Sequence, residues 1–409
     1  MANDALKAIA TAIDNNEVAE ILPVEPDVFM SYSDLFEFVK DYYTKHSTAP
    51  TRSIIEDKLN IVVPPGDGKT EYHIQQAKEH YVKHRVGNLL LRINSGLESE
   101  SATDILAEMT KATNTLKKYT ASAKDVNMTD VADAEEYFAK LRNASEDDRP
   151  GIKTGFKSLD LSYPTGLMPG QSLIAIGYSG HGKSLFTAKM AVNIWKQKKR
   201  VLVISLEMSP EEYRERVYAL VAQGENNISM SDLATGKVSS EDFKAFADEH
   251  LLDANDFIVI SNEGRMDVTP AFIQSKIDMY KPQFVLLDYL QLMMDDSRSE
   301  GMTPRMMNLS REIKLMAMAN NIPIMSISAV TDDEGKKRAG PPKVSQVAWS
   351  RGLEYDANMI LAVHKHEDTN IIQVVSRKVR NGKPFDFVLE VDFDNGVWVE
   401  KQTSEIMLQ

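Results

Sequence analysis

Residues 177–184 read GYSGHGKS, and this octet holds the residue types that bind nucleotide phosphates. It fits the pattern G-x-x-x-x-G-K-[ST], in which glycines let backbone N–H groups close around phosphate oxygens. The lysine is expected to reach the outer phosphates, and the serine hydroxyl can hold Mg²⁺. An apolar run precedes the octet and a helical pattern follows it, as the motif requires. The predicted nucleotide-binding residues are Gly177, Tyr178, Ser179, Gly180, His181, Gly182, Lys183 and Ser184.

Two carboxylates that follow apolar runs could complete a site for nucleotide hydrolysis. Asp288 ends FVLLD, which predicts a carboxylate at the carboxyl edge of a buried strand, where open α/β sheets bind ligands. Its expected role is Mg²⁺ ligation, directly or through water. Glu207 follows the run VLVISL and could orient the attacking water as a general base. Geometry alone leaves an alternative open for Glu207, a surface residue that starts the next helix.

A second stretch, GDGKT at residues 66–70, imitates the phosphate motif without completing it. Val63 stands where the first glycine of the motif is required, and two prolines stiffen the approach to the lysine. We therefore predict a loop at this point of the chain, with no second phosphate-binding site.

Composition excludes several classes of protein. The chain has 409 residues and no cysteine, which excludes disulfides, thiolate metal sites and cysteine catalysis and favours a reducing compartment. A net charge of −13 argues against a broad basic face for nucleic acid, while a narrow basic channel remains compatible with it. The longest apolar runs are too short to span a bilayer. The acidic N-terminal stretch lacks the basic start and apolar centre of a secretion signal.

Two compositions meet near residue 150 and predict the domain organisation. Helical patterns dominate residues 1–120, which we predict to be a small all-α domain. Residues 121–152 are predicted to be a linker with one short amphipathic helix, whose apolar stripe packs either within its own chain or on a neighbouring subunit. In residues 153–409, short β-branched runs alternate with helical stretches, which predicts a mainly parallel sheet covered by helices. Turn dipeptides predict hairpins near the end of the chain, at Asn381-Gly382 and Asn395-Gly396.

The order of these motifs resembles that of the DnaB-type replicative helicases, which are hexameric RecA-like motors. The resemblance rests on SLEMS together with GYSGHGKS, on LLDYLQLM, on KVRNG and on the lead-in IKTGFKSLDLSYPTGLMPGQ. It covers about residues 150–400 and extends weakly to the N-terminal helices, and phage replicative helicases are similar too. It implies an α/β RecA-like P-loop ATPase domain preceded by a small all-α N-terminal domain and a linker helix.

The resemblance implies an ATP-dependent replicative DNA helicase that translocates on single-stranded DNA through a ring, usually 5′ to 3′, and unwinds duplex at the replication fork. ATP and Mg²⁺ are the implied cofactors. The implied partners are single-stranded DNA, further copies of the chain in a hexamer, a primase and a helicase loader. The implied location is a bacterial or phage-infected host cytoplasm, with no membrane. Two alternatives stay open: a RecA- or KaiC-like ATPase acting in recombination or regulation, and a helicase-like loader or scaffold.

The resemblance also implies a role for individual residues. Ser184 and Asp288 match the Mg²⁺ ligands of the family, and Glu207 matches its catalytic carboxylate. Arg380, with Lys378 as its companion, matches an arginine finger that family members send into the neighbouring subunit's ATP site, where it supplies transition-state charge. Without the resemblance, a solvated basic hairpin is the simpler interpretation of this stretch.

Two departures from the family pattern concern the coupling of hydrolysis to DNA. Ser328-Ala329 stands where a Ser-Gln pair is usual, so the glutamine that senses the γ-phosphate is absent or moved. Ala348 stands where a DNA-contacting loop usually has arginine, and Arg351 is near enough in sequence to substitute for it. ATP hydrolysis is still expected, whereas DNA contact and coupling are left in question.

Two segments after predicted strands, 294–308 and 330–351, are candidates for contact with single-stranded DNA. Their cations and N–H groups could follow phosphates without reading sequence, and a few cations per subunit suffice when a ring surrounds the strand. The alternative is a pair of solvated loops, in which acidic neighbours offset part of the positive charge. The candidate residues are Arg298, Arg305, Lys336, Lys337, Arg338, Lys343 and Arg351.

Overall fold

The structure is a computed structural model that describes residues 3–120, 127–145, 149–225, 227–261, 267–297, 299–330, 340–347 and 350–401. Its internal contacts divide the chain into two compact units, Met1–Val131 and Ala132–Gln409. Within the described ranges, no helix is both long and apolar enough to cross a membrane.

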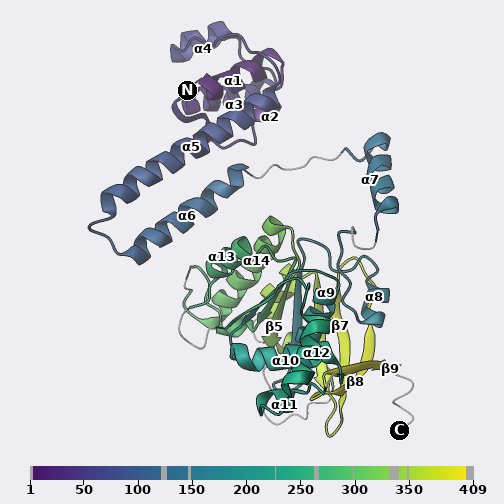
Figure 1. Cartoon of the computed structure of the whole chain (residues 1–409). Coiled ribbons are helices and arrows are strands. Elements are labelled where there is room, and N and C mark those ends of the chain that lie inside the picture. The colour runs from purple at the N-terminus through teal and green to yellow at the C-terminus, as the bar shows by residue number, and fades with distance from the viewer. Residues whose placement is uncertain are drawn as a thin grey trace. The chain divides into compact units, whose positions relative to one another are not determined.

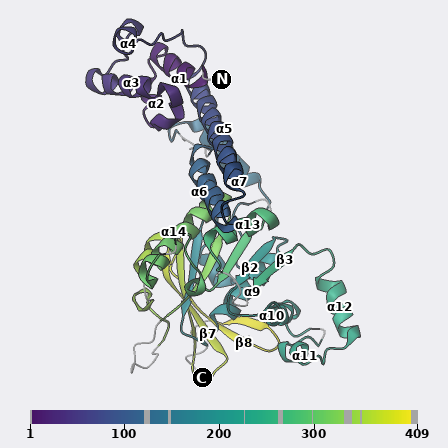
Figure 2. The same ribbon diagram turned by 90° about the vertical axis from the view of Figure 1, so that its left-hand side faces the viewer.

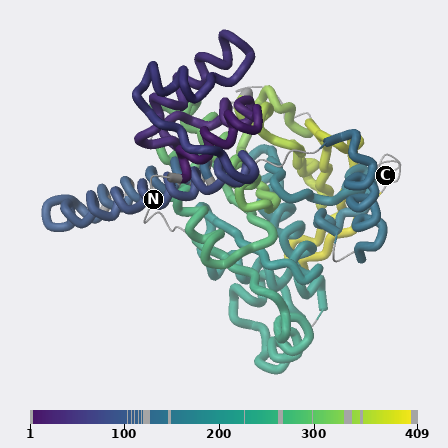
Figure 3. Tube along the Cα trace, turned by 90° about the horizontal axis from the view of Figure 1, so that it is seen from above, coloured from purple at the N-terminus to yellow at the C-terminus, as the bar shows by residue number. Residues whose placement is uncertain are grey.

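The first unit is all-helical, as its periodicity predicts (Figure 1). Short helices form a bundle, and the long pair α5 and α6 extends from it (Figure 3). In the bundle core, the rings of Phe29 and Phe36 stack with their centroids 4.4 Å apart. The segment GDGK forms the connection before α5, so the predicted loop is confirmed. The elements are α1 (Asn3–Asp14), α2 (Val18–Ile21), η1 (Pro26–Tyr32), α3 (Ser33–His46), α4 (Arg52–Leu59), α5 (Thr70–Gly96) and α6 (Ala102–Thr120).

The helix predicted in the linker is α7 (Val131–Asn143), and much of its apolar stripe is exposed. None of its residues is buried. Val131 is 75% exposed and Phe138 is 54% exposed. A helix this short gains little stability by itself in water, so these apolar side chains are available for packing against another surface.

The second unit is built on one nine-stranded sheet with the order β3-β2-β4-β5-β1-β6-β7-β8-β9. Strands β1 to β6 pair in parallel, and β7 to β9 continue the sheet as antiparallel strands. The predicted strands and hairpins are thereby confirmed. The strands are β1 (Ser172–Gly177), β2 (Val201–Ser205), β3 (Phe257–Ser261), β4 (Phe284–Asp288), β5 (Ile324–Ala329), β6 (Met359–Lys365), β7 (Ile371–Val379), β8 (Asp386–Asp392) and β9 (Val397–Lys401).

Helices cover both faces of the parallel strands, with α13 and α14 on one side and α9, α10 and α12 on the other (Figures 1 and 2). Successive side chains of a strand point to opposite faces, and β1 shows this directly. Leu173 and Ala175 join the core beneath α9 and α10, while Ile174 and Ile176 join the core beneath α13 and α14. The helices are α8 (Lys157–Ser162), α9 (Lys183–Lys196), α10 (Pro210–Ala222), α11 (Met230–Ala234), α12 (Ser240–His250), α13 (Pro270–Tyr280), η2 (Leu290–Leu292), α14 (Met302–Asn320), η3 (Val344–Gln346) and α15 (Ser350–Asp356).

The turn between β8 and β9 packs against α10 at a glycine. Gly396 has a φ of +65°, and a Cβ at this position would lie 2.3 Å from the carbonyl oxygen of Ala219. We expect Gly396→Ala to lower the free energy of unfolding by about 1–2 kcal/mol, because alanine is strained in the left-handed backbone conformation. Steric overlap with the backbone of α10 should cost about 1–3 kcal/mol more.

Gly236→Ala is the matched control, because Gly236 has a φ of +68° and open space within 4 Å of its added Cβ. It should lose only the backbone contribution. Urea unfolding followed by tryptophan fluorescence measures both variants, since Trp195, Trp349 and Trp398 all belong to the second unit. Equal losses of stability in the two variants would contradict the packing of this turn on α10.

Candidate active site

The phosphate-binding octet connects β1 to α9 and places its last residues in the first turn of the helix. Gly182 has a φ of +81°, a left-handed conformation that favours glycine, and a Cβ there would lie 2.8 Å from Cδ1 of Ile372. Lys183 begins α9, and its Nζ donates a hydrogen bond of 2.7 Å to the carbonyl oxygen of Tyr178. The N-terminus of a helix attracts anions through its unpaired N–H groups and its dipole.

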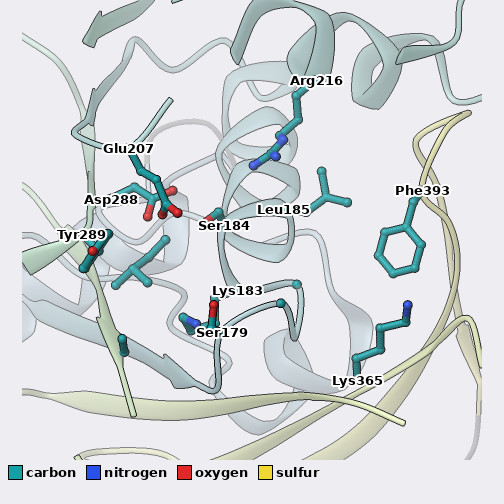
Figure 4. Close-up of a pocket in the computed structure, with 14 residues that line it drawn as sticks. Ser179, Lys183, Ser184, Leu185, Glu207, Arg216, Asp288, Tyr289, Lys365 and Phe393 are labelled. Carbon is teal, nitrogen blue, oxygen red and sulfur yellow. The ribbon is translucent and has the colours of Figure 1, made fainter. Parts of the chain in front are cut away.

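A cavity of about 420 Å³ opens beside this helix N-terminus (Figure 4). Its volume lies in the range of ligand pockets. Several predicted residues line it: Ser179, Gly180, Gly182, Lys183, Ser184, Glu207 and Asp288. Other lining residues were not predicted to contact a ligand: Leu185, Arg216, Tyr289, Ile327, Ala329, Lys365 and Phe393.

Parallel pairing brings the two carboxylates to this cavity. Ser205 of β2 is in register with Asp288 of β4, and the N–H of Leu206 donates to the Asp288 carbonyl oxygen at 2.7 Å. Glu207 therefore leaves β2 directly beside Asp288, with its side chain exposed. In Figure 4 the two carboxylates lie side by side near Ser184.

Asp288 is 2% exposed, and its Oδ1 has no hydrogen-bond partner among the described residues. Burial raises the pKa of its carboxyl to about 6, a hydrogen bond from Ser184 lowers it, and the neighbouring Glu207 raises it. A buried carboxylate oxygen without a partner, next to a serine hydroxyl, is a donor set that suits a hard cation such as Mg²⁺. The residues present thus fit the cation that the phosphate motif implies.

Two cations offset the acidic charge of the cavity. Burial lowers the pKa of Lys183, while the carboxylates of Asp288 and Glu207 oppose that shift. Arg216 reaches the cavity from α10, and its Nε is buried without a hydrogen-bond partner among the described residues. The cavity therefore presents two cationic groups that can meet the negative charge of a phosphate.

Sequence reasoning missed Arg216, although the phase of α10 identifies it. Tyr213 and Val217 are buried, and residue 216 shares their face because positions three and four apart lie together on a helix. Arg214 projects elsewhere and lines a different cavity, beside Trp195 and β3. A capping box between Ser209 and Glu212, which starts two residues after Glu207, begins α10. The start of the helix at this point determines which of its residues face the cavity.

The other end of the cavity has a different chemistry. Lys365 ends β6 and Phe393 lies in the turn after β8, with the lysine Nζ 5.0 Å from the ring centroid. Figure 4 shows this pair across the phosphate loop from Glu207 and Asp288. No local pattern marks either residue, because each reaches the site only through long-range strand pairing.

Three of the predicted nucleotide-binding residues do not line the cavity. Gly177 ends β1, and its carbonyl oxygen accepts the N–H of Val330 at 3.1 Å. Tyr178 is buried, and the Nδ1 of His181 accepts the N–H of Lys365 at 3.2 Å. In the described structure, these residues hold the phosphate loop against its neighbours.

The predicted finger residues also lie outside this cavity. Arg380 is exposed and donates to the carbonyl oxygen of Tyr355 at 2.7 Å, while Lys378 donates to that of Glu354. Both acceptors belong to the last turn of α15, where a helix dipole favours cations. The two cations therefore stand together at the end of β7.

The candidate DNA-binding residues are only partly described. Arg305 lies within α14, and its guanidinium contacts the sulfur atoms of Met294 and Met302 at 3.2 and 2.8 Å, so the expected free loop cation is instead half-buried. The side chain of Lys343 is exposed. Arg351 belongs to α15, with its side chain outside the description. The remaining candidates, and Ala348, lie outside the described residues: Arg298, Lys336, Lys337 and Arg338.

At the end of β5, Ala329 lines the cavity with a methyl group where the resembling family usually has a glutamine. The amide of Gln291, from η2, occupies the adjacent space. Its Nε2 donates to Ser328 Oγ at 2.9 Å and to the Ala329 carbonyl oxygen at 3.2 Å. The side-chain amide of Gln291 therefore lies beside the end of β5, although it comes from η2 and not from β5 itself.

A mainly parallel sheet with a phosphate loop after β1 and carboxylates after β2 and β4 defines a P-loop ATPase of the RecA-like class. Residues 151–395 match the family model described as DnaB-like helicase C terminal domain. This match spans more than half of the chain, which therefore belongs to the DnaB-like helicase family of ATP-dependent helicases.

Two curated relatives are replicative DNA helicases. DnaC of Bacillus subtilis (strain 168) is 25% identical over 346 residues, which cover 81% of this chain and 74% of the relative. DnaB of Geobacillus stearothermophilus is 28% identical over 245 residues, covering 57% of this chain and about half of the relative, 52%. By this distant homology, the chain is a replicative DNA helicase.

Two solved structures are similar in fold. One, described as a DnaB-like replicative helicase and its interactions with primase, has a TM-score of 0.66 and 17% identity, and the match covers 97% of this chain and 98% of that one. The other, described as an ATPase domain, has a TM-score of 0.57 and 21% identity, with 68% of this chain and 100% of that one covered. Both likenesses support the RecA-like fold.

We expect Arg216→Ala to reduce the turnover of ATP about 100-fold, because a preorganised cation facing a transferring phosphoryl group contributes roughly 3 kcal/mol. Nucleotide affinity should change less than turnover, since Lys183 and the helix N-terminus remain. Steady-state ATPase assays and ADP titrations measure the two effects. Arg214→Ala is the matched control on the same helix and should leave turnover within about twofold. Equal effects of the two variants would refute a role for Arg216 at the cavity.

Proposed function

We propose that this helicase couples ATP hydrolysis at the cavity to translocation along single-stranded DNA through a ring of identical chains, unwinding duplex at the replication fork. One observation carries the proposal. Lys183, Glu207 and Asp288 arrive from three separate strand ends and line one cavity. Each residue has a distinct role in phosphoryl transfer, which is chiefly a matter of positioning and charge.

The hydrolytic step divides among the cavity residues. Lys183 and Arg216 hold the outer phosphates, and Glu207 accepts a proton as a water oxygen bonds to the γ-phosphorus. The bond between that phosphorus and the bridging oxygen breaks, so ADP and inorganic phosphate leave. Ser184 and Asp288 would hold Mg²⁺, which when bound neutralises charge between the phosphates. The exposed carboxylate of Glu207 suits its role, since it faces the entry of water.

Two exposed features support assembly of identical chains, which we propose to form a hexamer. Arg380 and Lys378 stand at the end of β7, away from the chain's own cavity, and would complete the cavity of a neighbour. The exposed part of the apolar stripe of α7 would pack on another subunit. A cation supplied in trans stabilises the transition state only when the neighbour is seated, so hydrolysis depends on the arrangement of subunits.

We propose contact with single-stranded DNA for residues 294–308, which include Arg298 and Arg305, and for residues 330–351. The exposed side chain of Lys343 supports this role, whereas the half-buried guanidinium of Arg305 packs against methionine sulfur and lends it no support. From the family, we also propose translocation from 5′ to 3′ and a primase and a loader as partners. The proposed location is a bacterial or phage-infected cytoplasm. The primase interaction of one structurally similar helicase is in keeping with this proposal.

The first test is unwinding of forked DNA with ATP and Mg²⁺, with the mass of the oligomer measured in the same buffer. The wild-type chain should unwind as a ring, and Lys183→Ala should lower ATP turnover about 100-fold or more, because phosphate charge loses its cation. Glu207→Gln is the control, which should keep nucleotide binding and lose hydrolysis. DNA-stimulated hydrolysis without unwinding would favour the strand-exchange alternative, and DNA binding without hydrolysis would favour a loader or scaffold.

A subunit-mixing experiment tests the trans role of Arg380. Rings of Arg380→Ala chains and rings of Glu207→Ala chains should each be inactive. Mixed rings should regain turnover, because some interfaces then pair an intact carboxylate with an intact arginine. The ratio of the two variants is varied, since the order of subunits in a ring is random. Absence of rescue at every ratio, with rings still formed, would count against the trans role.

A further inference from the structure

One side-chain amide joins the phosphate-binding loop to the segment that carries Lys343. Gln346 is the last residue of η3. Its Oε1 accepts the backbone N–H of Lys343 at 2.8 Å, and its Nε2 donates to the phenolic oxygen of Tyr178 at 2.9 Å. A backbone N–H can only donate, so the amide oxygen must face Lys343 and the amide nitrogen must face Tyr178. The hydrogen-bond partners therefore fix the orientation of this amide.

Tyr178 connects the lysine of the phosphate motif to the segment that holds Gln346. Its phenol is held by Gln346, and its carbonyl oxygen accepts the 2.7 Å hydrogen bond from Nζ of Lys183. Lys183 lines the cavity and is the lysine of the phosphate motif. A phosphate oxygen that binds this ammonium changes the geometry of its hydrogen bond to the Tyr178 carbonyl, since both acceptors then share one nitrogen atom. Tyr178 thus experiences the occupancy of the cavity without lining it.

The segment that holds Gln346 is also fixed at its other end. Arg377 of β7 donates from Nε to the carbonyl oxygen of Pro342 at 2.7 Å, and from Nη2 to that of Pro341. The next residue of β7 is Lys378, and Arg380 follows its end. Residues 341–346 are therefore held between the phosphate loop and the strand that carries the finger residues.

We propose that Gln346 is the positioning residue through which nucleotide occupancy sets the position of Lys343. The relay runs from Lys183 through the Tyr178 backbone and phenol to the Gln346 amide, and from there to the Lys343 backbone. This inference rests on the proposed function, in which Lys343 contacts single-stranded DNA. It gives the ring a route from hydrolysis to DNA that does not need a glutamine at position 329. It also makes DNA affinity depend on the state of the nucleotide.

The relay can be followed without DNA because the chain has no cysteine. Ser345→Cys places a single thiol beside Gln346, at an exposed position, for an environment-sensitive fluorophore. Adding ADP or a non-hydrolysable ATP analogue to the full-length labelled chain should change the emission. Introducing the Gln346→Ala substitution into the labelled chain should remove this change in emission. It should leave the dissociation constant for ADP within about twofold of its value without the substitution. An unchanged response in that variant overturns the relay.

The second arm measures the affinity for a fluorescent single-stranded oligonucleotide in the ADP state and in the ATP-analogue state. The ratio of the two dissociation constants should differ from one in the wild-type chain by about fivefold or more, a coupling of roughly 1 kcal/mol. It should collapse toward one in Gln346→Ala. Tyr178→Phe, which removes only the phenolic hydroxyl, should lower the same ratio, and the double variant should lower it no further than Gln346→Ala alone.

Ser345→Ala is the control for damage to the segment and should keep the wild-type ratio. Equal weakening of DNA binding in both nucleotide states of Gln346→Ala, with the ratio preserved, assigns Gln346 a structural role only and overturns the proposal. A wild-type chain that responds to nucleotide at the fluorophore yet binds no DNA would instead reject the proposed function. The two failures are thereby distinguished.

Discussion

The parallel register of β1, β2, β4 and β5 is the constraint on which the site depends. Parallel strands end at the same edge of a sheet, so residues that follow them meet although the chain between them is long. Gly177 pairs with Ala329, and Ser205 pairs with Asp288. A slip of one residue in either pair would exchange the two faces of a strand and move its end away from the cavity. Helices cover both faces, so such a slip would move each row of side chains into the core on the opposite face, whose packing it does not fit.

Charge inside the cavity is balanced in a way that leaves it ready for a ligand. Asp288 carries a raised pKa because burial penalises its charged form, and Lys183 carries a lowered pKa for the same reason. Among the described residues, Oδ1 of Asp288 is buried without a hydrogen-bond partner, and so is Nε of Arg216, which adds a second cation. Unsatisfied buried polar groups are costly to a fold. A phosphate with its metal would satisfy these groups together. Their unsatisfied state is therefore a physical reason to assign a binding site here.

Local patterns predicted much of this architecture. The strand ends at Asp288 and before Glu207, and the helices of the N-terminal unit, are visible in runs of a few residues, because periodicity and capping act over short distances. Arg216 was within reach of the same reasoning, through the buried face of α10, and was overlooked. Lys365, Phe393 and Gln346 were not predictable, because strand pairing and loop closure across long separations bring them to the site. Likewise, no local pattern shows that the guanidinium of Arg305 packs against methionine sulfur.

Strand β7 has a mechanical consequence for a ring. Near its beginning, Ile372 packs against the phosphate loop, with its Cδ1 2.8 Å from the position that a Cβ at Gly182 would take. Just beyond its end stands Arg380, which on the proposed trans role belongs to the neighbour's cavity. An extended strand rises about 3.3 Å per residue, so the two positions lie roughly 26 Å apart along one stiff rod. Adjacent nucleotide sites would then be joined by a strut of fixed length, and a tilt that opens one site necessarily shifts the cation at the next.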